Sequence, residues 1–393
     1  MKSDLTIKEV FDNIMRDAVS VYSEEGLKKR LESGKKLRIK MGADPSRPDL
    51  HLGHSVPLRK LRMLQDLGHE IIFVIGDFTA MIGDPSGKSK TRVPLTFEQT
   101  RENAASYYEQ VTKILDKEKT TITYNSDWLS KMSFADVLSL AGKYTLARIM
   151  ERDDFQKRYN DYQPIGLHEL FYPLMQGYDS VALHADIEVG GTDQTFNLLV
   201  GRELQKDYEQ ESQEVVTFPL LPGLDGVEKM SKSLDNYIGI DEPADIMYEK
   251  CMKVPDNLIL EYFNLTTDLA EEEYRQLIEK DIRAAHFLYA ETIVRMYHGE
   301  QAVAPAAERY KSVAKGGIPD NIEEFSAPSG TRIIEMLVSA KLAPSMSEAR
   351  RLIQGNGIKL DGEPVTDVNS VIQAAGSYVI SKGKNKFARF IIK

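Results

Sequence analysis

The chain is poor in cysteine and has no long apolar run. Cys251 is its only cysteine in 393 residues, which excludes an internal disulfide and a cysteine-rich metal site. No stretch reaches the roughly 18 consecutive apolar residues that a membrane helix needs. The opening Met-Lys-Ser-Asp-Leu-Thr carries no apolar signal-peptide core. We therefore expect a soluble protein of the cytoplasm that makes no membrane contact.

Net charge is unevenly distributed along the sequence. The chain carries −10 overall, yet the residues from Thr331 onward contain ten Lys or Arg against five Asp or Glu. That segment is therefore positive by five charges, and the first 330 residues are negative by fifteen. A basic C-terminal module on an acidic body predicts polyanion binding at that end.

Hydrophobic patterning in the first third of the chain predicts a strand–helix–strand unit. Apolar residues alternate with cations over 37–41, a helical pattern covers 53–67, and 71–75 is a continuous apolar run typical of a buried parallel strand. Such a crossover belongs to a parallel sheet. We therefore predict an α/β fold with a Rossmann-like parallel sheet, whose ligand crevice lies where a strand leads into a helix.

The length predicts two or three domains. Further strands are expected at 185–189 and 215–221, and the region 96–163 reads as a mostly helical insertion between the two halves of the sheet. A stretch rich in glycine and proline reads as a linker before a small α/β unit. The predicted domains are 1–240 with the sheet, 241–315 as α-helical, 316–330 as linker and 331–393 as the small unit.

Two short motifs suggest binding of a nucleoside triphosphate. His51 and His54 share one face at a helix start, where free N–H groups and the helix dipole favour phosphate, and Gly53 permits close approach. A metal pair or two surface histidines would be the alternative. The segment Lys229-Met-Ser-Lys-Ser233 follows two glycine turns, so its lysines can close over the phosphates. The alternative there is a solvated turn.

Two more segments have residues suited to small-molecule contacts. Tyr172, Gln176 and Asp179 fall on one helical face among apolar neighbours. A carboxylate there can accept a hydrogen bond from a phenol, and phenylalanine would leave it unpaired, although such a stripe often faces solvent instead. Asp193 follows Gly190-Gly191 after a predicted strand and is placed like a ribose-binding carboxylate; alone, this is usually a turn.

The segment Gly83 to Lys88 resembles a Walker A loop but has three residues between its glycines instead of four. A phosphotransferase of the P-loop type is therefore disfavoured.

Further on, the segment 345–362 is predicted to form a capped helix, a glycine turn and a strand, and it resembles the S4 RNA-binding domain. Its proposed phosphate-binding cations are Arg350, Arg351 and Lys359, together with Lys382, Lys384, Lys386 and Arg389; a basic solvated surface is the alternative.

The motifs HLGH, GDPSGK, YPLMQGYD, GGTDQ and KMSKS occur in this order in the chain, which resembles the bacterial tyrosyl-tRNA synthetases, class I aminoacyl-tRNA synthetases with an S4-like tail. The resemblance covers the whole chain, and we identify the protein as a member. It implies formation of tyrosyl-adenylate from L-tyrosine and ATP with Mg²⁺ on the phosphates, then transfer to tRNA(Tyr) by a homodimer. It implies no metal held tightly by the protein.

The resemblance also implies residue roles. ATP and its phosphates would be held by Ser46, His51, Gly53, His54, Lys88, Arg92, Asp193, Lys229, Lys232 and Ser233, with Asp193 on the ribose. Tyrosine would be held by Asp44, Asp84, Tyr172, Gln176, Asp179 and Gln194, with Asp179 reading the phenol.

Two positions depart from the family pattern. Lys40 stands where many members have a tyrosine that contacts the substrate phenol, and Met41 stands where many have a small residue near the ribose. Besides the P-loop enzyme, a tryptophan-specific relative and a non-catalytic RNA-binding paralogue remain as alternatives. The paralogue would be expected to lack residues such as His51 and Lys232, which are present.

Overall fold

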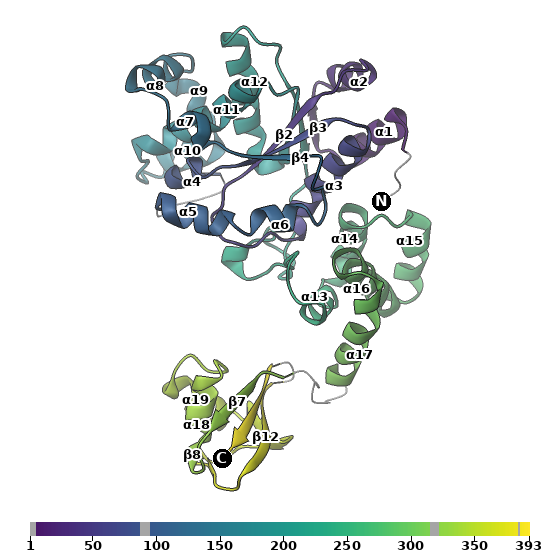
Figure 1. Cartoon of the computed structure of the whole chain (residues 1–393), viewed down its shortest axis with the longest axis vertical. Coiled ribbons are helices and arrows are strands. Elements are labelled where there is room, and N and C mark those ends of the chain that lie inside the picture. The colour runs from purple at the N-terminus through teal and green to yellow at the C-terminus, as the bar shows by residue number, and fades with distance from the viewer. Residues whose placement is uncertain (1–4, 87–94, 315–321, 384–385) are drawn as a thin grey trace. The chain divides into compact units, whose positions relative to one another are not determined.

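The computed structural model describes residues 5–86, 95–314, 322–383 and 386–393. It divides into two compact units. The colour in Figure 1 follows the chain from the N-terminus to the C-terminus. The first comprises Met1–Pro243 with Lys250–Tyr297, and the second comprises Ala244–Glu249 with His298–Lys393. No helix in the described part of the chain is both long and apolar enough to cross a membrane.

A six-stranded sheet in the order β1-β6-β5-β2-β3-β4 forms the centre of the first unit. All neighbours are parallel except the edge strand β1, which runs antiparallel to β6. The strands are β1 (Ser20–Tyr22), β2 (Arg38–Ala43), β3 (Glu70–Ile75), β4 (Thr120–Tyr124), β5 (Ile187–Gly191) and β6 (Glu214–Phe218). The predicted parallel α/β sheet is therefore confirmed.

The predicted strand–helix–strand unit is β2, α3 (Leu52–Asp66) and β3. Every side chain of β3 from Ile71 to Ile75 is at most 1% exposed, because parallel strands are covered on both faces. From β2 the chain adds β3 and β4 on one side, and β5 and β6 lie on the other. This reversal between β2 and β5 is the topological switch point, where such folds bind ligands.

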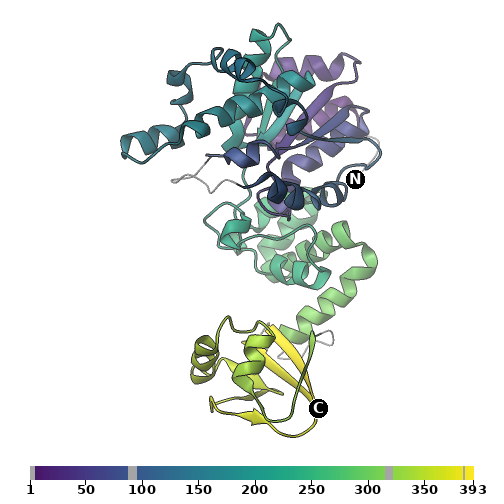
Figure 2. The same cartoon turned by 60° about the vertical axis from the view of Figure 1, so that its left-hand side comes forward.

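Helices cover both faces of the sheet. Figures 1 and 2 show α11 and α12 on one face and α1 and α3 on the other. Up to the end of the sheet the helices are α1 (Ile7–Asp17), α2 (Glu24–Glu32), α3, α4 (Thr79–Ile82), α5 (Phe97–Ala104), α6 (Tyr107–Val111), α7 (Ser126–Leu129), α8 (Phe134–Ala141), α9 (Leu146–Ile149), α10 (Asp153–Asn160), α11 (Tyr172–Leu183) and α12 (Thr195–Asp207), with 3₁₀ turns η1 (Leu167–Phe171) and η2 (Thr192–Gln194).

The region 96–163 is mostly helical, as predicted, but the expectation of an insertion between the halves of the sheet was wrong for its first part. Residues Thr120–Tyr124 form β4, which pairs with β3 and completes the sheet. Four of its five residues are β-branched, a strand preference. As an edge strand it is only partly buried, so it lacks the apolar run that marked β3.

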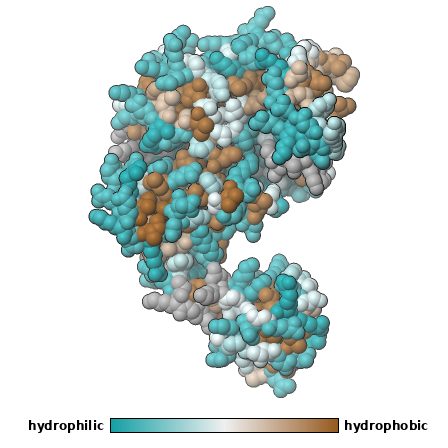
Figure 3. All heavy atoms as spheres, turned by 180° about the vertical axis from the view of Figure 1, so that it is seen from behind, coloured by the Kyte–Doolittle hydropathy of each residue, from teal (hydrophilic) through white to brown (hydrophobic). Residues whose placement is uncertain are grey.

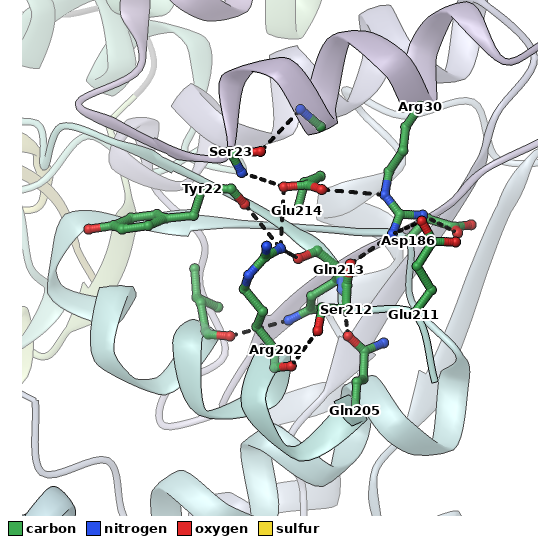
Figure 4. A network of polar contacts seen from close by, with 12 residues as sticks. Tyr22, Ser23, Arg30, Asp186, Arg202, Gln205, Glu211, Ser212, Gln213 and Glu214 are labelled. Atoms are coloured by element: carbon green, nitrogen blue, oxygen red, sulfur yellow. Dashed lines mark hydrogen bonds and ion pairs between the residues drawn. The ribbon is translucent and has the colours of Figure 1, made fainter. Parts of the chain in front are cut away.

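The amino-terminal edge of the sheet is closed by a network of polar contacts between α2, α12 and the starts of β5 and β6 (Figure 4). Arg30 Nη1 donates to Asp186 Oδ1 at 2.9 Å and Arg30 Nη2 to the Ser212 carbonyl at 2.7 Å. Glu214 accepts from the Ser23 amide and from Arg202 Nη1. These contacts join α2 and α12 to the amino ends of β5 and β6, at the end of the strands opposite their carboxyl ends.

The helices that follow the sheet belong partly to the first unit. They are η3 (Lys232–Leu234), α13 (Ala244–Cys251), η4 (Asp256–Leu258), α14 (Ile259–Thr266), α15 (Glu271–Lys280) and α16 (Ile282–His298). Arg59 of α3 forms an ion pair with Asp268, just after α14. The ion pair joins this helical segment to α3, the helix that begins within the HLGH motif.

The second unit contains η5 (Glu300–Ala302), α17 (Val303–Ala314) and a small α/β fold with its own apolar core. The fold comprises β7 (Glu324–Ala327), β8 (Thr331–Arg332), α18 (Ile333–Ser339), α19 (Met346–Gln354), β9 (Ile358–Leu360), β10 (Glu363–Pro364), β11 (Val371–Ile372), β12 (Gly376–Lys382) and β13 (Lys386–Ile392). Ser345 caps α19, accepting from the Glu348 amide, as the sequence predicted.

The prediction of a linker over 316–330 was wrong for its second half. Residues Glu324–Ala327 form β7, which pairs in parallel with β13 and so belongs to the small sheet. Phe325 packs against Phe390 with 5.3 Å between ring centroids. The flanking Pro328, Ser329 and Gly330 gave this segment the composition of a linker and hid a short strand.

Candidate active site

A cavity of about 710 Å³ opens at the carboxyl edge of the sheet, within the first unit. It lies at the switch point, since residues following β2 and β5 line it. The cavity brings together fourteen of the predicted site residues: Asp44, Ser46, His51, Gly53, His54, Asp84, Tyr172, Gln176, Asp179, Asp193, Gln194, Lys229, Lys232 and Ser233. Lys88 and Arg92 lie outside the described residues.

His51 and His54 lie together at the start of α3. Their ring centroids are 4.0 Å apart, and His54 Nδ1 accepts from the His51 amide at 3.2 Å. With Nδ1 as acceptor, the neutral ring carries its proton on Nε2. A Cβ on Gly53 would come within 3.0 Å of the His51 ring, so a side chain here would crowd this ring.

Both histidines are uncharged near neutral pH. Burial, and then the nearby Lys232 ammonium, lowers the pKa of His54 to about 3. Burial, followed by the influence of His54 and Lys232, also lowers the pKa of His51 well below its ordinary value. Within the described residues, His51 Nδ1 is buried without a hydrogen-bond partner. Each neutral imidazole keeps one N–H group, which can donate a hydrogen bond to a ligand.

The KMSKS segment lies over the cavity as an irregular loop. Lys229 Nζ pairs with Asp193 Oδ2 at 2.6 Å. Lys232 Nζ donates to the Arg47 carbonyl at 2.9 Å and approaches the Tyr107 hydroxyl at 3.3 Å. Burial lowers the pKa of Lys232 to about 8. Two ammonium groups therefore reach the mouth of the cavity from one loop.

Polar groups from α11 and from the segment after β2 also line the cavity. Asp44 accepts from Thr79 Oγ1 at 2.7 Å and from the Tyr172 hydroxyl at 3.0 Å. A Cβ on Gly76 would come within 2.1 Å of Asp44 Oδ1, so the glycine makes room for this carboxylate. The arrangement offers a fixed negative charge suited to an ammonium group.

Asp84 and Gln194 belong to a closed ring of side chains. Gln194 Nε2 donates to Asp84 Oδ2 at 2.9 Å, and Gln194 Oε1 accepts from Asn197 Nδ2 at 3.0 Å. Arg152 closes the ring by donating to Asn197 Oδ1 at 2.9 Å and to Ser86 Oγ at 3.0 Å. The Ser86 amide in turn donates to Asp84 Oδ1 at 2.8 Å. Asp84 and Gln194 are thereby fixed before any ligand arrives.

Asp179 lines the cavity and is 3% exposed. It accepts from Trp128 Nε1 at 2.8 Å and from Asn125 Nδ2 at 3.3 Å. Burial raises the pKa of Asp179 to about 7, against the opposing charge of Lys40. Met41 lines the cavity, whereas Lys40 is not among the lining residues.

Sequence reasoning missed four residues that organise the site: Tyr107, Asn125, Trp128 and Arg152. None belongs to a motif, and each reaches the cavity residues from the region 96–163. Their signal is visible only in three dimensions, as a buried polar side chain beside a site residue. A buried arginine such as Arg152, 5% exposed, must have partners close by, but sequence alone does not say which.

In the second unit, Arg350, Arg351 and Lys359 are exposed. Arg351 donates to Glu348 at 2.8 Å, Lys382 Nζ donates to the Leu342 carbonyl at 2.9 Å, and Arg389 pairs with Glu324 at 3.3 Å. Lys386 is exposed, and Lys384 lies outside the described residues. Three of the predicted phosphate-binding cations thus already have a protein partner.

The structure also bears on two alternative interpretations. Gly83 ends the four-residue helix α4 and does not follow a strand, so the described part of the GDPSGK segment lacks the strand that precedes a P-loop. Among the described residues, no three His, Cys, Asp or Glu side chains gather in a way that could hold a metal ion.

Two family models together cover most of the chain. Residues 32–314 match the class I tRNA synthetases of the W and Y type, and residues 315–390 match the tyrosine–tRNA ligase SYY-like C-terminal domain. The chain is 52% identical to a tyrosine–tRNA ligase of Deinococcus radiodurans, over 100% of this chain and 98% of that one. It is 48% identical to that of Thermotoga maritima, over 98% of both.

Solved structures share the fold. A tyrosyl-tRNA synthetase from Archaeoglobus fulgidus, complexed with L-tyrosine, matches with a TM-score of 0.59 and 25% identity, over 77% of this chain and 99% of that one. A C-terminally truncated mitochondrial tyrosyl-tRNA synthetase from Aspergillus nidulans matches with a TM-score of 0.65 and 22% identity, over 77% and 93%. The fold around the parallel sheet is thus that of a class I tRNA synthetase.

The relatives also distinguish between the two amino-acid types within that class. Those matching over nearly the full length are tyrosine–tRNA ligases, and the C-terminal segment matches the domain of the same enzymes. The chain belongs to the tyrosine–tRNA ligase family. The tryptophan-specific alternative therefore lacks the support that tyrosine has.

Proposed function

We propose that this protein activates L-tyrosine with ATP and transfers the tyrosyl group to the 3′ end of tRNA(Tyr). The single observation that carries the proposal is the cavity itself. Fourteen residues, predicted from the motifs and the family resemblance in widely separated parts of the sequence, line one space of about 710 Å³. The membership of the chain in the ligase family supports the same reading.

The phosphate side of the proposed site consists of neutral imidazoles and ammonium groups. His51 and His54 would donate from the start of α3 to the α-phosphoryl group, and Lys229 and Lys232 would stabilise charge on the leaving pyrophosphate. Asp193 would accept hydrogen bonds from the ribose hydroxyls. Ser46, Ser233, Lys88 and Arg92 are proposed as further phosphate contacts from the family roles. Mg²⁺ is proposed to enter with ATP, bound to its phosphates.

The amino-acid side would place the tyrosine carboxylate for attack. Asp44, Asp84, Tyr172 and Gln176 would hold the ammonium and carboxylate groups of the amino acid. Gln194 would contact the carboxylate, and Asp179 would accept a hydrogen bond from the phenol. The carboxylate then attacks the α-phosphorus, giving tyrosyl-adenylate and pyrophosphate. A ribose hydroxyl of tRNA takes the tyrosyl group and releases AMP. No protein nucleophile is needed, because positioning and charge stabilisation lower the barrier.

The second unit is proposed to bind the tRNA backbone. Arg350, Arg351 and Lys359 lie on α19 and β9 and are exposed, and exposed cations on a compact scaffold suit RNA phosphates.

We propose that the protein acts in the cytoplasm, where translation uses such an enzyme. The division into a catalytic domain, an α-helical domain and an S4-like domain remains part of the proposal.

A homodimer through the region of α8 to η1 is also proposed. Large apolar side chains are exposed here, among them Phe134 (77%), Leu138 (56%), Leu146 (60%) and Leu167 (78%). Brown side chains gather at the upper right of Figure 3, where this region lies. Apolar patches of this kind mark interfaces. Sedimentation of wild type and of a Phe134→Asp, Leu138→Asp variant tests this: the variant should sediment as a monomer.

Pyrophosphate exchange tests the central proposal. The protein should exchange labelled pyrophosphate into ATP with L-tyrosine, and show little exchange with tryptophan or phenylalanine. Aminoacylation of tRNA(Tyr) should follow with tyrosine alone. Exchange driven by tryptophan, or ATP hydrolysis without any amino acid, would contradict the proposal.

A further inference from the structure

A charged pair is buried directly behind the wall of the cavity. Lys40 Nζ of β2 lies 2.8 Å from Glu188 Oε1 of β5, and both side chains are 1% exposed. Neither residue lines the cavity. Two charges at this depth cost desolvation energy, and apolar residues of similar size often give a more stable protein. The pair therefore calls for an explanation other than stability.

The contacts of Lys40 lead to the helix that carries the amino-acid site. Lys40 Nζ donates to Ser180 Oγ at 2.8 Å and to the Gln176 carbonyl at 3.4 Å. Ser180 Oγ donates to Glu188 Oε2 at 2.9 Å, and Gln213 Nε2 donates to the same oxygen at 2.5 Å. The three protons of the Lys40 ammonium group are thus directed at Ser180 Oγ, the Gln176 carbonyl and Glu188 Oε1. Lys40 therefore contacts α11 at residues before and after Asp179 in the sequence.

Asp179 is a buried carboxylate on the same helix, and its hydrogen-bond donors Trp128 and Asn125 are uncharged. The charged groups acting on it are Lys40 from β2 and Glu188 from β5, and its polar neighbours are Asn125 and Trp128 of α7. Lys40 favours the ionised carboxylate, and Glu188 disfavours it. One ammonium therefore serves two buried carboxylates, and only Glu188 is in direct contact with it.

We propose that the Lys40–Glu188 pair sets the charge of Asp179 and thereby its ability to select the phenol of tyrosine. The proposal rests on the function proposed above. Lys40 does not replace a direct partner of the phenol. It is a positioning residue that lies outside the cavity and favours the ionised form of Asp179, and Glu188 opposes this effect. An ionised Asp179 accepts from a phenol O–H, and phenylalanine offers no such donor.

The test uses L-tyrosine binding without ATP, measured by calorimetry between about pH 5.5 and pH 9 and corrected at the upper end for ionisation of the amino group of the free amino acid. In the wild-type protein, affinity should rise with pH through a midpoint near 7, the value to which burial raises the pKa of Asp179. Lys40→Met should move the midpoint up, and Glu188→Gln should move it down, each by about one pH unit.

Opposite shifts separate this role from a structural one. Loss of either partner of a buried ion pair weakens the fold, so a purely structural pair would give two variants damaged in the same way. Lys60→Met supplies a matched control. Lys60 is also a buried lysine, 5% exposed, and pairs with Asp17. Its loss should lower the melting temperature and leave the midpoint of tyrosine binding unchanged.

Each outcome decides the matter. Opposite shifts in the two variants support the proposal. Equal midpoints in wild type, Lys40→Met and Glu188→Gln overturn it. If Lys40→Met does not fold, Glu188→Gln alone decides, since its midpoint must fall. A wild-type protein that neither binds tyrosine nor shows tyrosine-dependent exchange overturns the proposed function instead, so the two failures are distinguishable.

Discussion

Lys229 Nζ forms an ion pair with Asp193 Oδ2 at 2.6 Å across the mouth of the cavity. The two residues are 36 positions apart in sequence, one on the KMSKS loop and one just after β5. In the proposed mechanism they contact different parts of ATP, namely the phosphates and the ribose. The nucleotide must therefore replace an existing contact, and this gives a first prediction.

Asp193→Asn should raise KM for ATP by about tenfold, equivalent to about 1.4 kcal/mol, because a charged acceptor for the ribose hydroxyls is lost. The KM for tyrosine should stay within about twofold, since Asp193 is not part of the proposed amino-acid side. Pyrophosphate exchange at varied ATP measures both values. An unchanged KM for ATP would remove Asp193 from the ribose site.

Lys232→Ala should slow adenylate formation by about a hundredfold or more, while tyrosine binding changes little. The ammonium would act mainly on charge that develops as pyrophosphate leaves. Single-turnover formation of tyrosyl-adenylate measures the rate. Lys206→Ala is the control, because Lys206 is an exposed lysine that also has a partner, Glu203 at 2.8 Å. Normal exchange in the Lys232 variant would contradict the role.

The pH dependence of ATP use should reveal the same lysine. Burial lowers the pKa of Lys232 to about 8, so the free enzyme loses this positive charge as pH rises through 8. With tyrosine saturating, kcat/KM for ATP should fall above about pH 8, while kcat should hold to higher pH because bound phosphates favour the charged form. Lys232→Arg should remove the decline in kcat/KM. A decline that persists in that variant would assign it to another group.

His54→Asn should lower kcat for adenylate formation by about ten- to a hundredfold without changing KM for tyrosine. Asparagine keeps an acceptor for the His51 amide, but it lacks the Nε2 donor. Because the pKa of His54 is near 3, its charge state does not change above about pH 5, and the wild-type profile should show no limb from it there. Full activity in the variant would exclude a donor role.

Much of the fold followed from local pattern. Strands β2 and β3 and helix α3 were predictable because apolar side chains repeat with the period of each element. Strand β4 was missed since an edge strand shows no continuous apolar run, and β7 was missed because proline and glycine flank it. Both are recognised as strands only through their neighbours in the sheet.

The candidate site divides in a similar way. His51, Lys229 and Asp193 were found since their residue types and order carry a recognisable chemistry. Tyr107 and Arg152 were not, because their roles depend on which side chains they meet after folding. Lys40 could be read as unusual from sequence, but its turn toward Glu188, away from the cavity, required coordinates.

Helix α11 alone supplies Tyr172, Gln176 and Asp179. Their spacing is set by backbone hydrogen bonds within two turns of a buried helix, so this half of the site is rigid before any substrate arrives. The phosphate half depends on a loop whose longest regular piece is the three-residue turn η3. Tyrosine should therefore bind to the free protein much as it does in the full complex. Binding of ATP is completed only when the lysines of the loop leave their protein partners and contact the nucleotide instead.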